Sequence, residues 1–279
     1  MKTNLHIHTT VSDGRNTVEE VVNIMHSAGI EMMSITDHDR LDANSKAKEI
    51  ATRYGIRYLN GIEISVSANG LIESDTKDLS LHLLGYGFDL DSLESINRKM
   101  DIHKVDVALR LYHQLIRDGY VISYDPQSGI LNRTLIARLL IQAKYASSLD
   151  EAFQSILDLN YSKYRIPKLD PNRAISMVHE AGGIVVWAHP HEIISGVTKM
   201  RIDHDQVESI VKQLKGFGLD GLEARYAKYD MDTISLLEDL ASKYALCVTT
   251  GSDFHGKSDD EYSLLRSPVL EMGIQCNQL

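Results

Sequence analysis

Hydrophobic and polar positions along this chain follow two alternating periods. Residues 3–9, TNLHIHT, alternate with a period of two, which places Leu5 and Ile7 on one side of a strand and His6 and His8 on the other. A period of two over four to eight residues is typical of a half-buried β-strand. The pattern therefore predicts a first strand that carries two histidines on one face.

A segment with the helical period follows this strand in the sequence. Residues 16–30 carry apolar side chains three and four positions apart, Thr17 and Glu20 have the spacing of a capping box, and Gly29 suits a helix end. Residues 32–36, MMSIT, predict the second strand. A strand, a helix and a strand in this order form the unit from which parallel sheets are built.

The same alternation continues over most of the chain. The apolar runs predict further strands at residues 58–65, 80–87, 183–188, 221–225 and 245–250, with helices at about 43–54, before Gly182, at 205–215 and before the last strand. Residues 92–168 show several helical stretches and no convincing strand. We therefore expect an α/β fold with a parallel sheet, open or closed into a barrel, formed by residues 1–91 and 169–279, and a helical insertion over residues 92–168.

Composition narrows the class of protein. The chain has 279 residues and a formal net charge of −10, and this charge disfavours a general affinity for long nucleic acid or an anionic membrane. The first residues lack the apolar core of a signal peptide, and no run approaches the roughly 20 apolar residues of a membrane span. We expect a soluble, cytoplasmic protein without a disulfide scaffold, in which Cys247 is a small core residue.

Histidines and carboxylates gather where the predicted strands end. The carboxyl ends of parallel strands face the same way, so groups far apart in sequence converge on one face of the fold. The side chains at these ends are His6, His8, His38, Glu63, His82, His189, Asp253 and His255. Five other histidines fall within helical stretches, where we expect surface or packing roles: His26, His103, His113, His179 and His204.

The residue types at these ends indicate a metal centre. Imidazoles and carboxylates without thiolates suit Zn, Mn or Fe, and so large a ligand set exceeds what one ion can use. We therefore expect two or three divalent ions with positions left open for water and substrate. Two ions about 3.5 to 4 Å apart form the usual clamp for phosphoryl transfer.

Six segments in this order and spacing resemble the motifs of the PHP family, named for its polymerase and histidinol phosphatase members. They are HIHTTVSDG, TDHD, GIEIS, LHLLGYG, AHP and GSDFHG. The resemblance extends over the whole chain apart from the middle of the insertion. The chain most resembles the stand-alone phosphoesterases of this family that carry a helical insert. This group includes 3′,5′-nucleoside bisphosphate phosphatases, short-RNA 5′ exonucleases and a cyclic phosphate hydrolase.

The resemblance implies a distorted (β/α)7 barrel, similar to a TIM barrel, with a trinuclear metal site at the carboxyl ends of its strands. Carried over position by position, it implies the ligands His6, His8, Asp13, His38, Glu63, His82, His189, Asp253 and His255. It also implies that Glu63 bridges two ions. We expect Gly14 to allow a turn that brings Asp13 back to the metals.

Further residues are candidates for catalysis. Asp37 and Asp39 flank His38 and could orient imidazoles, although Asp39 could instead cap the following helix. A nearby histidine or aspartate would protonate the departing alkoxide, and the candidates are Asp39, His191 and His255. His191 could equally be a solvated loop residue.

Substrate contacts are expected mainly from basic side chains, because guanidinium groups clamp phosphate well. Arg133 and Arg138 match a GRPHIAR segment common in relatives with nucleotide activity, but Thr134 and Leu135 replace its proline and histidine. Lys168 follows a stretch that is glycine-rich in many relatives, and Arg225 lies at a strand end, where a surface salt bridge is nearly as plausible.

Together these features predict a metal-dependent phosphoesterase that acts on a phosphomonoester of a small metabolite, a nucleotide or phosphosugar. A metal-bridging hydroxide would attack phosphorus while the metals and two arginines, Arg133 and Arg138, neutralise the phosphate oxygens. Three alternatives stay open: a cyclic phosphodiesterase, a 5′ to 3′ exonuclease on short RNA that stacks bases on tyrosines, and a non-catalytic metal-binding regulatory module.

Overall fold

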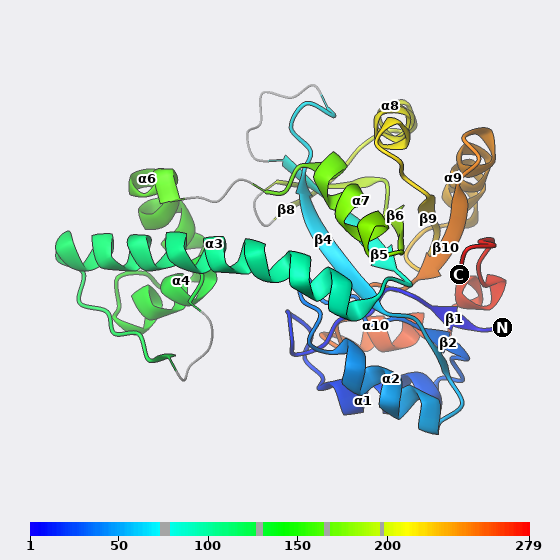
Figure 1. Ribbon diagram of the computed structural model, residues 1–279, viewed down its shortest axis with the longest axis horizontal. Helices are drawn as coiled ribbons and strands as arrows, with labels where there is room; N and C mark the ends of the chain where they lie inside the picture. Colours follow the sequence, from blue (N-terminus) through cyan, green and yellow to red (C-terminus); the bar gives the residue numbers. More distant parts are fainter. Residues whose placement is uncertain (73–78, 127–130, 165–167, 196–197) are drawn as a thin grey trace. The chain divides into compact units, whose positions relative to one another are not determined.

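The computed structural model describes residues 1–72, 79–126, 131–164, 168–195 and 198–279 (Figure 1). The chain divides into two compact units. The barrel unit comprises Met1–Glu94 and Lys168–Leu279, and the helical unit comprises Ser95–Pro167.

The barrel unit contains all the strands of the described residues. They are β1 (Thr3–Asn4), β2 (Met32–Met33), β3 (Arg57–Tyr58), β4 (Gly61–Ser67), β5 (Leu79–Tyr86), β6 (Ile184–Trp187), β7 (Glu192–Ser195), β8 (Thr198–Arg201), β9 (Gly221–Tyr226) and β10 (Cys247–Gly251). Its helices are α1 (Val18–Ser27), α2 (Asn44–Arg53), α7 (Pro171–Glu180), α8 (His204–Gly216), α9 (Met231–Lys243), α10 (Asp259–Leu264) and the 3-10 helix η4 (Pro268–Met272). The long helix α3 (Leu90–Arg117) begins here and continues into the helical unit.

Backbone pairing arranges the strands around a distorted barrel. One sheet has the order β1-β2-β3, and the other has the order β10-β9-β6-β5-β7-β8 with β4 paired to β5. Two isolated parallel bridges join the sheets: Ile7 pairs with Phe254 beyond β1 and β10, and His38 pairs with Glu63 beyond β2. The expected α/β class and distorted barrel are therefore confirmed.

The sheet differs from the expected all-parallel arrangement. β4 and β5 are antiparallel, as are β5 and β6, whereas β6, β9 and β10 run parallel. Only residues 68–78 connect β4 to β5, and a parallel pair needs a crossover of a dozen or more residues. The β7–β8 pair was not expected from the sequence at all.

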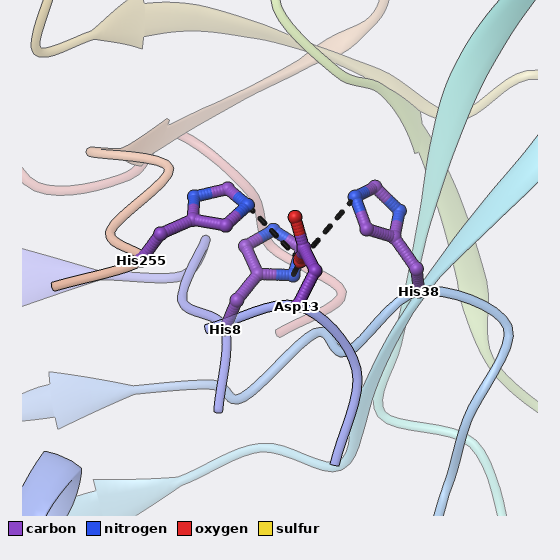
Figure 2. Close-up of side chains that lie close together, drawn as sticks. All are labelled: His8, Asp13, His38 and His255. Atoms are coloured by element: carbon purple, nitrogen blue, oxygen red, sulfur yellow. Dashed lines mark ion pairs between the residues drawn. The ribbon is translucent and has the colours of Figure 1, made fainter. Parts of the chain in front are cut away.

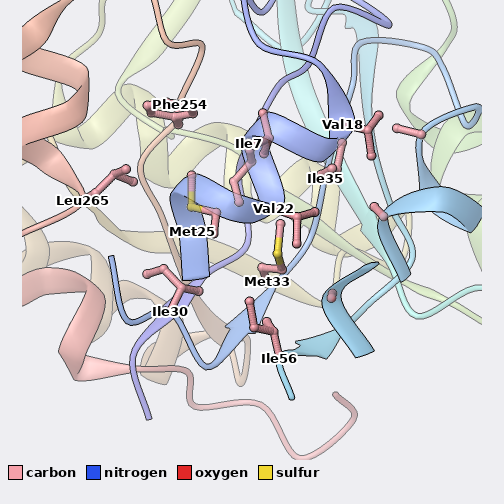
Figure 3. Close-up of a cluster of buried hydrophobic side chains, with 14 of the residues drawn as sticks. Ile7, Val18, Val22, Met25, Ile30, Met33, Ile35, Ile56, Phe254 and Leu265 are labelled. Carbon is pink, nitrogen blue, oxygen red and sulfur yellow. The ribbon is translucent and has the colours of Figure 1, made fainter. Parts of the chain in front are cut away.

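Helix α1 forms as its sequence predicts. The Thr17 side chain accepts from the Glu20 backbone N–H and the Glu20 carboxylate accepts from the Thr17 backbone, which completes the capping box. Its apolar stripe packs with α2, beside it in Figure 1, and with β2 in the cluster drawn in Figure 3. Met25 is fully buried there, so truncation to alanine should cost about 2–5 kcal/mol.

The first strand shows how the barrel separates its core from its site. Leu5 and Ile7 are fully buried in two apolar clusters, and the alternating His6 and His8 point to the other side. Regular pairing stops at Asn4, so both histidines follow the strand. The expected alternation of apolar and histidine side chains is present in a shorter strand than predicted.

The helical unit has its own apolar core. Its further elements are α4 (Arg133–Gln142), α5 (Leu149–Glu151), the π-helical turn η2 (Ala152–Leu157), α6 (Asp158–Asn160) and the 3-10 helix η3 (Ser162–Tyr164). The core includes the fully buried Leu111, Leu115, Ile136 and Leu140. None of the helices in the described part of the chain combines the length and apolar composition that a membrane span requires.

Candidate metal centre

Nine side chains with nitrogen or oxygen donors meet in the barrel unit, Glu63 and His82 from within β4 and β5 and the others from segments that follow strands. Three groups have donor atoms that all lie within 4.8 Å of one another. They are His8, Asp13, His38 and His255; His6, His8, Glu63 and Asp253; and His38, Glu63 and His82. His189 joins them, because its Nε2 lies 3.5 Å from a Glu63 oxygen. All nine residues expected as ligands therefore lie in one cluster.

Glu63, on β4, is the hub of this cluster and is fully buried. Its Oε2 lies 3.2 Å from His6 Nε2, 3.1 Å from His8 Nε2 and 3.2 Å from His38 Nδ1. Its Oε1 faces the other way, 2.7 Å from His82 Nδ1. The two oxygens thus face different sets of imidazoles, as a bridging carboxylate requires.

A second buried glutamate, Glu223 on β9, fixes the first ligand. Its two oxygens lie 3.0 and 3.1 Å from His6 Nδ1, and Oε2 also accepts the backbone N–H of His189 at 2.9 Å. When Nδ1 carries the proton, the Nε2 lone pair of His6 faces the cluster. This is the carboxylate–histidine arrangement that orients metal ligands in proteins.

The exposed side of the cluster is formed around Asp13 (Figure 2). Asp13 Oδ1 lies 3.2 Å from His255 Nε2, 3.8 Å from His8 Nδ1 and 3.9 Å from His38 Nε2. The Asp13 and His38 side chains are 47% and 27% exposed, whereas His6, His8 and Glu63 are completely buried. Substrate and solvent can therefore approach from the side of Asp13 and His38.

The donor atoms fit metal ions better than they fit one another. His6 Nε2, both nitrogens of His8, His38 Nδ1 and Glu63 Oε2 are buried and make no hydrogen bond of acceptable geometry within the described residues. Buried polar groups without partners are rare, so such a concentration indicates that ions complete it. Metal bonds of about 2.0–2.2 Å place neighbouring ligands about 3.0–3.5 Å apart, which matches the separations around Glu63.

The electrostatics of the cluster favour ionised carboxylates. Burial would raise the pKa of Glu63, but His38, His82 and His6 outweigh it and hold this pKa well below its usual value. Burial lowers the pKa of His38 to about 3, with His8 and His82 adding to this effect, so its imidazole is neutral. Glu63 and His38 are therefore in the protonation states that bind metal. Burial lowers the pKa of His6 and of His8, but the neighbouring carboxylates outweigh it and raise both, that of His8 to about 9, so these two imidazoles would release a proton to an incoming ion.

Backbone strain concentrates at the same place. Asp39, His189 and Asp253 have φ angles of 52°, 30° and 53°, in the left-handed region that L-residues rarely adopt. Such strain persists where the surrounding structure enforces it, commonly at functional sites. Gly14 is needed for space, because a Cβ there would lie 2.7 Å from the His8 carbonyl group.

Asp37 and Asp39 do not orient imidazoles as expected. The Asp37 carboxylate accepts from the Thr9 backbone, the Thr9 hydroxyl and the Ser12 hydroxyl, and so holds the loop that leads to Asp13. Asp39 accepts from the Ser65 backbone N–H at 3.2 Å. Both aspartates accept from backbone N–H groups, and α2 has no side-chain cap at its start, so Asp39 does not cap this helix. The acid role of Asp39 stays a prediction.

His191 also differs from its expected role. Its side chain is buried, and its Nδ1 lies 3.0 Å from the Ile202 carbonyl oxygen. Burial lowers the pKa of His191, which favours the neutral ring over the protonated form that a general acid needs. Its contacts are those of a packed residue and not those of a solvated loop histidine.

Arg225 is turned away from the cluster. Its Nε donates to Glu238 of α9 at 2.6 Å, and its Nη1 donates to the carbonyl oxygens of Met272 and Gly273. The register of β9 and β10 shifts between Val248 and Thr250, a β-bulge that breaks the alternation of β9. Arg225 is therefore buried in structural contacts, and we leave it out of the substrate site.

The other basic candidates lie in different settings. Arg133 donates to Asp158 at 2.6 Å, its guanidinium lies over the Phe153 ring, and Arg138 is exposed on α4. Lys168 donates to the Ser80 hydroxyl at 2.6 Å. Ser80 lies two residues before His82 on the same face of β5, so the Lys168 ammonium group lies near the cluster.

Three residues at the cluster were missed in the sequence. Glu223 interrupts an apolar strand just as Glu63 does, and a buried carboxylate in a strand was a usable signal. Lys228 and Lys257 donate to Asp253 and Asp13. They lie in loops, where no periodic pattern marks them.

The chain belongs to the PHP domain family, whose model matches residues 4–181. Its fold and its donor cluster are those of a metal-dependent phosphoesterase, a hydrolase. A solved structure from Bifidobacterium adolescentis that is assigned as a metal-dependent phosphoesterase is 25% identical, with a TM-score of 0.64 over 91% of this chain and 88% of that one. A Chromobacterium violaceum amidohydrolase structure, 23% identical over 98% of this chain and 97% of that one, has a TM-score of 0.66 and shares the fold.

Curated relatives of nearly equal length differ in activity. A 5′-3′ exoribonuclease of Haemophilus influenzae is 27% identical over 91% of this chain and 90% of its own. A phosphoribosyl 1,2-cyclic phosphate 1,2-diphosphodiesterase of Eggerthella lenta is 24% identical over 91% and 94%. A 3′,5′-nucleoside bisphosphate phosphatase of Chromobacterium violaceum is 24% identical over 91% and 87%. All three act on phosphate esters.

Proposed function

We propose that the nine clustered side chains hold two or three divalent ions, Mn, Fe or Zn, and that the protein hydrolyses a phosphomonoester of a small metabolite, a nucleotide or phosphosugar. The observation that carries this proposal is the convergence of buried, unpartnered donor atoms around Glu63. A decayed, non-catalytic module would be expected to have lost ligands, whereas all nine positions carry donors here.

Each part of the cluster has a distinct task in this proposal. Divalent ions bound there supply Lewis acidity, which activates water and neutralises charge on the phosphate. Glu63 bridges neighbouring positions, and Glu223 holds the His6 ring so that Nε2 faces inward. Asp13 and His38 lie where substrate arrives, because their side chains are the exposed ones.

The helical unit contributes substrate contacts in this proposal through Arg138, which is exposed on α4. Arg133 serves the fold of that unit instead, because its guanidinium is already engaged by Asp158 and Phe153. In the barrel unit, Lys168 is proposed to attract the anionic substrate toward His82.

A cyclic phosphodiesterase is the second candidate function. It is favoured by the relative from Eggerthella lenta and by Thr134 and Leu135, which depart from the segment of nucleotide-processing relatives. A short-RNA exonuclease would need exposed aromatic rings for base stacking. Tyr161 is buried in the core of the helical unit and Tyr112 is partly buried there, whereas Tyr54, Tyr145 and Tyr262 are exposed. This alternative therefore stays open.

Product release from three substrate classes would test this proposal. The purified chain, loaded separately with Mn, Fe or Zn, should release inorganic phosphate from a panel of nucleotide and sugar monophosphates. A 1,2-cyclic sugar phosphate and a dinucleotide are the comparison substrates. Turnover of the cyclic ester alone would favour the second candidate, and no release from any class with any metal would contradict the proposal.

A further inference from the structure

The side chains at the entrance to the cluster include two lysines. Lys257 donates to Asp13 Oδ2 at 2.8 Å, and Lys228 donates to Asp253 Oδ2 at 3.1 Å. We call Asp13, His38, Lys228 and Lys257 the mouth of the centre. The two lysine side chains are 41% and 36% exposed, so their ammonium groups can meet a solvent-borne ligand.

Both lysines occupy the same position relative to the cluster. Asp13 Oδ1 and Asp253 Oδ1 face imidazoles, at 3.2 Å from His255 Nε2 and 3.3 Å from His8 Nε2. Each lysine takes the other oxygen, Oδ2, of its aspartate. The ammonium groups therefore lie beside the donor cluster. Each is hydrogen-bonded to the aspartate oxygen that does not face the imidazoles.

We propose that Lys228 and Lys257 form a clamp for the phosphate oxygens of the substrate that the metal ions do not hold. This inference rests on the phosphoesterase function proposed above. An ammonium group has three N–H donors, so each lysine that donates to an aspartate keeps donors for a phosphate oxygen. A chain with a net charge of −10 needs such local positive charge to attract an anion.

A purely structural role explains the two lysines less well. The Lys257–Asp13 pair has side chains that are 41% and 47% exposed, and such a pair stabilises a fold by only about 0–1 kcal/mol, so the fold itself has little need of it. Both pairs nevertheless involve proposed ligands, whereas a comparable pair, Lys243 with Glu208, lies on α9 and α8 away from any proposed ligand.

A cavity beside Lys228 indicates which kind of phosphate ester fits. It has a volume of about 550 Å³ and is lined by Lys228, Ser258, Asp260, Glu261 and Ser263, among others. Hydroxyl and carboxylate groups hydrogen-bond sugar hydroxyls and repel a second phosphate. We therefore expect a substrate whose organic part carries hydroxyl groups and whose single phosphate group is bound by the two lysines.

Binding of inorganic phosphate tests the clamp separately from turnover. Lys228→Gln, Lys257→Gln and the double variant are compared with Lys243→Gln as the matched control. Calorimetry on the metal-loaded proteins should show phosphate binding about tenfold weaker in each single variant and weaker still in the double variant, with the control unchanged. Metal content should stay equal to that of the wild type in all four.

Two results would overturn the clamp. Phosphate affinity that is unchanged in the double variant would make the lysines ordinary surface pairs. Metal content that falls together with phosphate affinity would make them supports for Asp13 and Asp253. If the loaded wild type hydrolysed no phosphate ester, the proposed function would fail by itself, and the phosphate titration would still decide the clamp.

The substrate class is tested by comparison within one series. A sugar monophosphate should show a higher kcat/KM than the same sugar carrying a second phosphate, and the preference should shrink in Asp260→Asn. An equal or higher kcat/KM for the bisphosphate in the wild type would contradict the cavity argument while leaving the clamp standing.

An independent observation concerns the two cysteines. Val248 of β10 and Gln275 exchange two backbone hydrogen bonds, at 3.0 and 2.8 Å, in an antiparallel bridge. Cys247 and Cys276 are therefore the directly opposed pair next to it, a non-hydrogen-bonded pair whose Cα atoms lie about 4.5 Å apart in such ladders. Disulfides span Cα separations of about 4.4–6.8 Å.

We infer that Cys247 and Cys276 form a reversible intrachain disulfide that joins the C-terminal segment to β10. The Cys247 thiol already contacts the C-terminal segment, because its Sγ donates to Gln278 Oε1 at 3.8 Å. A small disulfide such as oxidised glutathione accepts the two electrons and two protons and leaves as two thiols. The S–S bond replaces the two S–H bonds.

Thiol counting tests this disulfide on the folded protein. After incubation with oxidised glutathione, the wild type should lose both titratable thiols, remain monomeric in electrophoresis without reductant, and unfold at a higher temperature. Cys247→Ser and Cys276→Ser should each keep one thiol or carry a bound glutathione. Two persisting thiols, or covalent dimers, in the wild type would refute the pairing.

Discussion

The buried part of the candidate centre, which we call its wall and which includes His6, Glu63 and Glu223, differs from the exposed mouth in burial and in contacts. In the wall, His6, Glu63 and Glu223 are completely inaccessible, each lies within about 3.5 Å of several other donor atoms, and Gly251 leaves no room for a side chain. In the mouth, the side chains are between a quarter and a half exposed, and the lysines bind only the outer oxygens of aspartates. The wall therefore sets where ions bind, and the mouth sets what reaches them.

The largest loss of metal and of activity is expected from a substitution at His8, where the wall and the mouth meet. His8 belongs to two of the donor groups, one on each side, so His8→Ala should remove more than one ion and lower kcat/KM by about a thousandfold or more. Metal analysis of the purified protein checks the stoichiometry, with His26→Ala on α1 as the control. Loss of a single ion with activity preserved would show that the groups are independent.

In the wall itself, Gly251→Ala should come next. A Cβ there would lie 2.3 Å from Glu223 Oε1 and 2.5 Å from the His6 Cβ, so the carboxylate–histidine pair must move. We expect activity to fall by about a hundredfold with a lower melting temperature. Gly216→Ala on α8 meets nothing within 4 Å and should leave both unchanged or slightly raise stability.

Glu223→Gln should act in the same direction but less strongly. The amide keeps the volume but weakens the hold on the His6 ring, so metal affinity should fall by about ten- to a hundredfold. Competition with a chelator measures this change, and Glu180→Gln on the exposed end of α7 serves as the control. An unchanged affinity would remove Glu223 from the account of the wall.

At the mouth, Asp13→Asn should have the smallest effect. Asp13 takes part in one donor group, and its side chain is half exposed, so only the outermost ion should bind about tenfold more weakly. Asp253→Asn, in the buried group, should lose more metal than Asp13→Asn does. The reverse order of losses would contradict the division into wall and mouth.

The fold could be predicted from the sequence where periodicity is strong. The strand–helix alternation gives α1, α2, α7, α8 and α9 nearly as they are, because capping residues and apolar stripes are local signals. Antiparallel pairing of β4 and β5 could not be seen in this way, because pairing direction depends on the connection between strands and not on their pattern. The β7–β8 pair was missed for the same reason.

In the site, the sequence indicated which residues converge but not how their neighbours are used. Arg225 lies on the same strand as Glu223, and the bulge in β9 turns it away from the cluster. The position of Lys228 and Lys257 at the cluster becomes visible only through their aspartate partners, which are 25 and 244 residues away in sequence. Such long-range pairs leave no trace in a periodic pattern.

Anomalous diffraction from crystals grown with manganese tests the central claim most directly. We expect two or three peaks, each bonded to donors of one group, with Glu63 shared between neighbouring peaks. A single peak, or peaks that do not involve Glu63, would contradict the claim that this carboxylate is the hub of a multinuclear phosphoesterase centre.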